Sequence, residues 1–215
     1  MKKFAVILSG CGVYDGSEIH EAVLTLLAID KNGATYEIFA PDIDQHHTIN
    51  HLTGKVTTEV RNVLVESARI ARGNIKSLEL FDEADFDALI FPGGFGAAKN
   101  LSTFAFKGAA CDVNVDVGNA VLSMVERNKP VGAMCIAPAV IAKILHDVDV
   151  SIGSNVDEAD QIKKMGARHF NSEHGDVIKD KKLKVFSTPC YNIKATISQV
   201  ATDADNIVKA MLNNM

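Results

Sequence analysis

The strongest constraint on the fold is a set of short, uninterrupted apolar runs separated by longer amphipathic segments. The clearest runs are Phe4–Leu8, Ala88–Phe91 and Val131–Met134, and helical patterns fill residues 18–31 and 113–128. Continuous apolar strands are typical of a parallel sheet that helices cover on both faces, whereas half-exposed strands alternate. The pattern predicts a three-layer α/β/α sandwich with a mostly parallel sheet.

Length and composition limit the classes of protein to consider. The 215 residues suit a single domain over 1–215, and the net charge of -5 with no dense Lys/Arg run argues against nucleic-acid binding. No run approaches the ~18 apolar residues of a membrane span, and the apolar run Phe4–Leu8 is too short for a secretory signal. Because the four cysteines form no C-x-x-C pair, we expect reduced thiols, no metal and a cytoplasmic location.

Cys135 is the most specific chemical signal in the sequence. It directly follows the apolar run Val131–Met134 and precedes a helical segment, with Ala133 two residues before it and Ala137 two residues after. A nucleophile elbow needs small residues at these positions because its strand-to-helix turn is tight. A thiol at a helix N-terminus would also be expected to have a lowered pKa. The alternative is a buried cysteine that only packs.

Three further features follow predicted strands, and sites in such sheets form where strands end. Gly93 and Gly94 follow the strand that ends at Phe91, and a glycine turn can offer backbone N–H groups to an oxyanion or simply be a turn. Glu18 and Glu21 share the first turn of a helix, where a carboxylate can act as a general base or only complement the helix dipole. Cys11, between two glycines after the first strand, either faces the site or packs in its loop.

The histidines give no comparable signal. His46, His47 and His51 lie in a polar segment, residues 42–58, that we expect to run over the surface, and they lack the paired cysteine or carboxylate of a metal site. His20 is expected to be structural.

Four segments together resemble the ElbB family of glyoxalases, in the PfpI branch of the class I glutamine amidotransferase-like superfamily. They are residues 9–21 (SGCGVYDGSEIHE), 49–54 (INHLTG), 92–101 (PGGFGAAKNL) and 134–139 (MCIAPA), in order along essentially the whole chain. The resemblance implies a flavodoxin-like fold, a homodimer and a bacterial cytosolic protein.

The resemblance also implies roles for individual residues. Cys135 corresponds to the nucleophile, Glu21 to the helix glutamate, with Glu18 as the alternative, and Gly93 and Gly94 to the glycine turn that supplies oxyanion donors. The chain departs from many members of the branch in having Ile136, where they have histidine, directly after the cysteine. It also lacks the His-x-Glu pattern of amidotransferases near its C-terminus, so glutamine hydrolysis is not expected.

The residues and the resemblance together predict a cofactor-independent glyoxalase acting on a small dicarbonyl. Cys135 would add to the aldehyde as a hemithioacetal, backbone N–H groups near Gly94 and Ile136 would hold the oxyanion, and Glu21 or Glu18 would move the proton. Glyoxal would give glycolate, and methylglyoxal would give lactate. The alternatives are a non-enzymatic redox sensor that uses the same thiol and, from the resemblance alone, an accessory role in isoprenoid biosynthesis.

Overall fold

A seven-stranded sheet forms the centre of the protein in the computed structural model, which describes all residues 1–215. The strand order is β10-β11-β7-β6-β1-β2-β5, and every neighbouring pair is parallel except β10 with β11. The strands are β1 (Lys3–Ile7), β2 (Thr35–Ala40), β5 (Lys76–Ser77), β6 (Ala88–Phe91), β7 (Val131–Met134), β10 (Ile178–Asp180) and β11 (Val185–Thr188).

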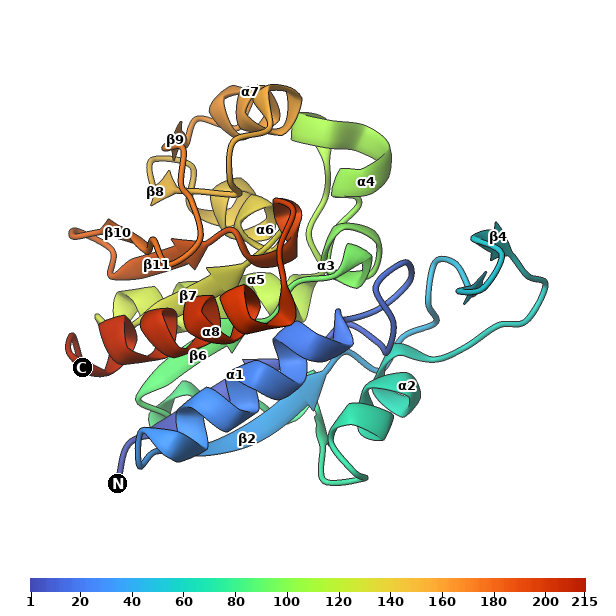
Figure 1. Cartoon of the computed structure of the whole chain (residues 1–215). Coiled ribbons are helices and arrows are strands. Elements are labelled where there is room, and N and C mark those ends of the chain that lie inside the picture. The colour runs from blue at the N-terminus through green and yellow to red at the C-terminus, as the bar shows by residue number, and fades with distance from the viewer.

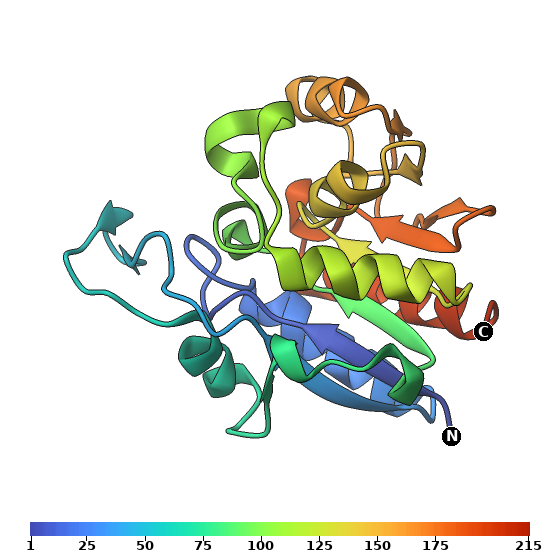
Figure 2. The ribbon, with the colours of Figure 1, turned by 180° about the vertical axis from the view of Figure 1, so that it is seen from behind.

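Helices cover both faces of this sheet, so the predicted α/β/α sandwich with a mostly parallel sheet is confirmed (Figures 1 and 2). Helices α1 and α8 lie side by side over one face, and α5 lies over the other (Figures 1 and 2). The helices are α1 (Ile19–Lys31), α2 (Val63–Ile70), α3 (Phe95–Lys99), α4 (Phe104–Lys107), α5 (Val115–Glu126), α6 (Pro138–Leu145), α7 (Val156–Lys164) and α8 (Ile197–Leu212). None of them is long and apolar enough to cross a bilayer.

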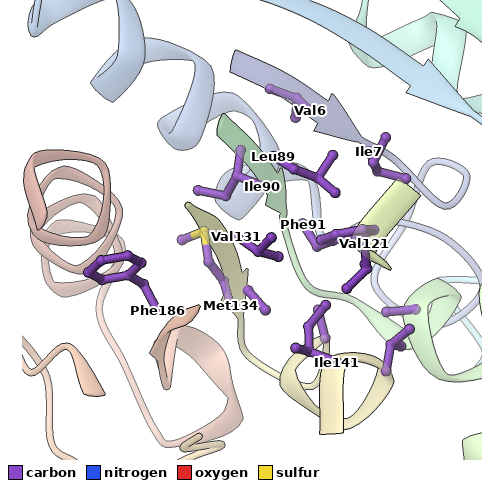
Figure 3. Packing of buried hydrophobic residues seen from close by; sticks show 14 of the residues in the cluster. Val6, Ile7, Leu89, Ile90, Phe91, Val121, Val131, Met134, Ile141 and Phe186 are labelled. Atoms are coloured by element: carbon purple, nitrogen blue, oxygen red, sulfur yellow. The ribbon is translucent and has the colours of Figure 1, made fainter. Parts of the chain in front are cut away.

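The hydrophobic core fills the space between the sheet and its two helical layers. Figure 3 shows Val121 of α5 and Ile141 of α6 on one side of the strands and Phe186 on the other side, beside α8. All three side chains are fully buried, as is every residue of β6 and β7. Burial on both faces explains why these two strands read as unbroken apolar runs.

The largest departure of the chain from this sandwich is the segment 42–62, which carries the short hairpin of β3 (Ile49–Asn50) and β4 (Lys55–Val56). It extends away from the body of the protein (Figures 1 and 2), so the predicted surface excursion is confirmed.

Several element boundaries differ from the sequence prediction. Serine is a favoured N-cap residue, so the sequence predicts Ser17 as the cap of the helix that follows it. In the structure the Ser17 hydroxyl accepts a hydrogen bond from the Ser9 N–H instead, and Glu18 is the cap of α1. The apolar residues within 148–152 also predict a strand. The structure forms only β8 (Asp149–Val150) there, and it pairs with β9 (Arg168–His169) outside the main sheet.

The sheet reverses its winding between β1 and β6. Strand β2 follows β1 on one side, and the chain then returns to place β6 on the other side of β1. In open parallel sheets, ligands bind outside the carboxyl ends of the strands at such a point. The loops after β1, β6 and β7 therefore meet where a site is expected, and the Glu18 N–H donates to the Gly93 carbonyl at 2.9 Å across two of these loops.

Candidate active site

Cys135 occupies a sharp turn between β7 and α6. Its φ of 58° lies in the left-handed region, which side chains other than glycine rarely adopt and which recurs at functional sites. Its N–H donates to the Thr188 carbonyl at 3.0 Å, so the turn is fixed against the end of β11. Ala133 and Ala137 are fully buried on either side of the turn. The backbone thus has the strand–turn–helix geometry of a nucleophile elbow.

Gly93 makes room for the cysteine and its neighbouring carboxyl group. A Cβ at this position would lie 2.3 Å from the Cys135 Cβ and 2.5 Å from Glu21 Oε2, closer than side chains tolerate. The Gly93 N–H donates to Glu21 Oε2 at 2.9 Å. The expectation that Gly93 supplies an oxyanion donor is therefore wrong, because its N–H is already bound to the carboxyl group.

Glu21 is fully buried behind the cysteine. Its Oε1 accepts a hydrogen bond from the Tyr191 N–H at 3.1 Å, and its carboxyl group is hydrogen-bonded to the Cys135 thiol. Burial raises the pKa of Glu21 to about 8, against the hydrogen bonds from Tyr191, Cys135 and Gly93, which lower it. A carboxyl group with a pKa near neutrality can both accept and return a proton.

Glu18 has a different position from Glu21, although both belong to the start of α1. Its side chain caps the helix, because Oε2 accepts the Glu21 N–H at 2.7 Å. It also lines a small cavity above Cys135, whereas Glu21 does not. The structure thus separates the two glutamates that the sequence left as alternatives: Glu21 adjoins the sulfur, and Glu18 forms part of the cavity wall.

The pKa of the Cys135 thiol is not lowered, contrary to the prediction from the sequence. Burial first, and then the Glu21 carboxylate, raise the pKa of the Cys135 thiol well above its ordinary value. The backbone N–H groups of Gly94 and Ile136 act in the opposite direction. These two N–H groups therefore lie by the sulfur, where they are able to stabilise an oxyanion. The lowering of the thiol pKa that the sequence predicts from the helix N-terminus is too weak to outweigh the effect of burial.

The cavity over the sulfur has a volume of about 110 Å³. It is lined by Val13, Glu18, Gly94, Phe95, Cys135, Ile136, Glu158, Tyr191 and Asn192. Glu158 and Asn192 are not among the residues predicted from the sequence. Asn192 Oδ1 lies 3.9 Å from Cys135 Sγ, and Asn192 Nδ2 donates to the Ile152 carbonyl at 2.7 Å and to Glu158 Oε2 at 2.6 Å. These two hydrogen bonds to acceptors fix the amide so that its oxygen faces the thiol.

Glu158 places a second carboxyl group of raised pKa at the cavity. Burial raises the pKa of Glu158, although the hydrogen bond from Asn192 lowers it. No sequence signal marks these two residues, because their contact joins the N-terminal half of α7 (Val156–Lys164) to the loop after β11.

Cys11 is not part of this site. It does not line the cavity, and the charges that act on its thiol belong to Glu66 and Arg69 of α2, to Arg61 just before α2 and to Asp15 in the loop after β1. The Gly10 N–H donates to Ser67 Oγ at 2.9 Å, which holds this loop against α2. The expectation that Cys11 contributes to substrate binding is wrong for this reason.

The histidines also lie outside the cavity lining. His20 Nδ1 is 2.9 Å from the Tyr191 hydroxyl, while His174 binds Asp203 and the Lys194 carbonyl. No group of three or more His, Cys, Asp or Glu side chains is placed to hold a metal ion. The chemistry available at Cys135 is thus that of one thiol, the carboxyl groups of Glu21, Glu18 and Glu158, and the backbone N–H donors.

Comparison with known proteins reveals close relatives. The human protein named glutamine amidotransferase-like class 1 domain-containing protein 3, mitochondrial, is 44% identical over 220 residues, which cover 98% of this chain and 82% of that protein. The zebrafish (Danio rerio) ES1 protein, mitochondrial, is 37% identical over 204 residues, covering 87% of this chain and 76% of that protein. No protein-family model matches the chain. The predicted cytoplasmic location is wrong on this comparison, because these curated relatives are named mitochondrial proteins.

Solved structures support the same relationship. An isoprenoid biosynthesis protein with an amidotransferase-like domain from Ehrlichia chaffeensis superposes with a TM-score of 0.93 at 37% identity, covering 100% of this chain and 99% of that one. Drosophila melanogaster DJ-1beta shares the fold at a TM-score of 0.57 and 14% identity, covering 98% and 90% of the two chains. The flavodoxin-like fold that the resemblance implied is confirmed. The expected homodimer stays a prediction.

Proposed function

The chain belongs to the glutamine amidotransferase-like class 1 family, and on this premise we propose that it is a cofactor-independent glyoxalase of the ElbB type. The observation that carries the proposal is the placement of the Cys135 sulfur beneath a small cavity of about 110 Å³, with Glu21 on one side and two backbone N–H donors by the sulfur. This cavity has room for a small dicarbonyl such as glyoxal or methylglyoxal.

Glu21 activates the thiol in the first step. Its carboxylate takes the Cys135 proton, and the sulfur adds to the aldehyde carbon of the substrate. The N–H groups of Gly94 and Ile136 stabilise the oxyanion, which then takes a proton and becomes a hemithioacetal. Because Glu21 can hold this proton at a pKa of about 8, it can pass it back without a histidine.

A carboxylate in the cavity wall then moves the carbon-bound proton. Glu158 and Glu18 both line the cavity, but Glu18 is engaged as the cap of α1. Burial raises the pKa of Glu158, which favours it as a general base. The base removes the proton of the former aldehyde carbon and returns it to the neighbouring carbon through an enediol. The product is a Cys135 thioester, and its hydrolysis by water releases the hydroxy acid and restores the thiol.

Two other functions are less well supported by the site. A redox sensor needs a thiolate at neutral pH, and burial together with Glu21 holds the pKa of the Cys135 thiol well above its ordinary value. An isoprenoid diphosphate needs cations, but the charged residues of the cavity wall are Glu18 and Glu158. Both observations favour chemistry on a small neutral carbonyl compound.

The test is glycolate release from glyoxal by purified protein without added thiol or metal. We expect turnover by the wild type and loss of at least 100-fold with Cys135→Ala and with Glu21→Gln. Cys111→Ala is the matched control, because Cys111 is also a buried cysteine but does not line the cavity, and it is expected to keep turnover. Full turnover by Cys135→Ala would refute the proposal.

Glu158→Gln and Glu18→Gln separate the two candidate carbon bases. If Glu158 moves the proton, Glu158→Gln still forms a hemithioacetal, visible as protection of Cys135 from alkylation, but releases no glycolate. Glycolate release by Glu158→Gln together with its loss in Glu18→Gln would assign the step to Glu18 instead.

A further inference from the structure

The cavity above Cys135 adjoins a second, larger hollow, which we call the vestibule. The vestibule has a volume of about 340 Å³ and lies between α3, α4 and α7, with Phe95, Phe104 and Phe106 among its lining residues. It shares Phe95, Ile136 and Glu158 with the wall of the Cys135 cavity. A molecule bound at the sulfur can therefore extend past these three residues into the vestibule.

The sizes of the two spaces indicate different occupants. Cavities that bind small molecules usually measure ~300–1,000 Å³, and one water accounts for ~30 Å³ of the liquid. The 110 Å³ cavity is below that range and fits only a reacting dicarbonyl group, whereas the 340 Å³ vestibule is within it. Glyoxal alone would leave the vestibule filled with water against aromatic walls, which is unfavourable compared with an apolar group.

Charge limits what the vestibule can accept. The charged residues that line it are Asp157 and Glu158, and no lysine or arginine is among the lining residues. Lys99 lies 5.2 Å from the centre of the Phe95 ring, but its ammonium group donates to the Tyr14 carbonyl and does not line the vestibule. An anionic substituent would thus face two carboxyl groups without a counter-charge.

We propose, building on the glyoxalase function above, that the substrate class is a neutral 2-oxoaldehyde with an apolar substituent. Its aldehyde carbon binds Cys135, and its substituent packs among the phenylalanines of the vestibule. The reaction is an internal redox exchange, in which the aldehyde carbon is oxidised, the keto carbon is reduced, and water releases the 2-hydroxy acid from the thioester. No external oxidant or reductant takes part.

The first experiment compares kcat/KM for glyoxal, phenylglyoxal and 4-carboxyphenylglyoxal, with the rate of Cys135→Ala subtracted as background. We expect phenylglyoxal to exceed glyoxal by at least tenfold, and the carboxylated compound to fall below phenylglyoxal by at least tenfold. Ala105 lines the vestibule on its exposed side, so Ala105→Trp fills it and is expected to reduce the phenylglyoxal-to-glyoxal ratio at least tenfold. Ala110→Trp, an exposed alanine outside the lining, is the matched control and should keep the ratio.

A second experiment is independent of turnover. Alkylation of Cys135 by iodoacetamide, N-phenyliodoacetamide and iodoacetate is followed at pH 8.5 by mass spectrometry, each rate being divided by that of free cysteine. We expect the phenyl compound to be favoured and iodoacetate to be disfavoured, each by at least fivefold, and Ala105→Trp to remove the first preference.

The two experiments separate the inference from the proposed function. If no dicarbonyl turns over but the labelling preferences hold, the glyoxalase reaction is refuted and the site for a neutral, apolar ligand stands. If glyoxal turns over at least as efficiently as phenylglyoxal, or if labelling shows no preference for the phenyl compound, the inference is overturned whatever the result for the reaction.

Discussion

Replacing Glu21 by glutamine should change how stability depends on pH, because this carboxyl group is buried in its protonated form. Its pKa is about 8 in the folded protein, against 4.5 for an ordinary glutamate side chain, so the folded state binds one more proton between these values. Stability then falls as pH rises, since the folded protein must release a proton that the unfolded chain has already lost. The stabilising contribution is fully present below pH 4.5 and is lost as pH rises through 8.

The magnitude follows from the size of the shift. Three and a half pH units at about 1.36 kcal/mol each correspond to about 5 kcal/mol of unfolding free energy lost between pH 4.5 and 8. The Cys135 thiol does not add to this slope below pH 8, because its pKa is held well above the ordinary value. This loss is comparable with a large part of the ~5–15 kcal/mol by which native proteins are usually stable.

Urea unfolding at pH 5, 6, 7 and 8, at constant ionic strength, measures this effect. The free energy of unfolding of the wild type minus that of Glu21→Gln is expected to fall by about 1.4 kcal/mol per pH unit. Glutamine accepts only one of the two N–H groups that bind Glu21, so the variant also loses a constant amount that leaves the slope unaffected. Glu126→Gln removes an exposed carboxyl group and serves as control. Parallel curves for wild type and Glu21→Gln would refute the raised pKa.

Three further outcomes are expected. The kcat/KM of the proposed reaction should rise about tenfold per pH unit up to about 8 and then level off, as Glu21 ionises; a profile that is flat from pH 6 to 9 would contradict its role as base. Gly93→Ala should lower the free energy of unfolding by about 1–3 kcal/mol and reduce alkylation of Cys135, because the new Cβ would overlap the Cys135 Cβ, and unchanged melting would show that the turn can relax. Asn192→Ala should lower the free energy of unfolding, measured by thermal unfolding, by about 1–3 kcal/mol, because it leaves Glu158 without its donor. The isosteric Asn192→Asp should lose more of this free energy at pH 8 than at pH 5, because it places two carboxylates together. Equal losses at both pH values would argue against the contact.

The sequence predicts best those parts of the fold whose signals are local. Ala88–Phe91 and Val131–Met134 are strands to the residue, because full burial on both faces requires unbroken apolar runs and because a proline–glycine turn or the elbow ends them. The turn at Cys135 is equally predictable from the sequence, since its tight geometry restricts the neighbouring residues to small side chains.

The parts of the site that were missed depend on contacts between distant segments. The Tyr191 N–H binds Glu21 across 170 residues of sequence, and Asn192 reaches Cys135 across 57. A backbone donor has no side-chain signature, and an asparagine is too common to mark a site. The error about the Cys135 pKa has the same origin, because the helix end is a local feature while burial and the Glu21 carboxylate come from the assembled fold.

The segment after β11, Cys190–Asn192, also determines at what stage of protein synthesis the site can assemble. Cys135 leaves the ribosome more than fifty residues before Asn192, and its partner strand β11 follows it by a similar interval. Until that strand docks, the thiol is in water, without the burial that suppresses its ionisation. An incomplete chain is therefore more reactive towards alkylating agents at neutral pH than the finished protein. The reactivity of one cysteine thus reports, during synthesis or refolding, whether the last third of the molecule has docked against the rest of it.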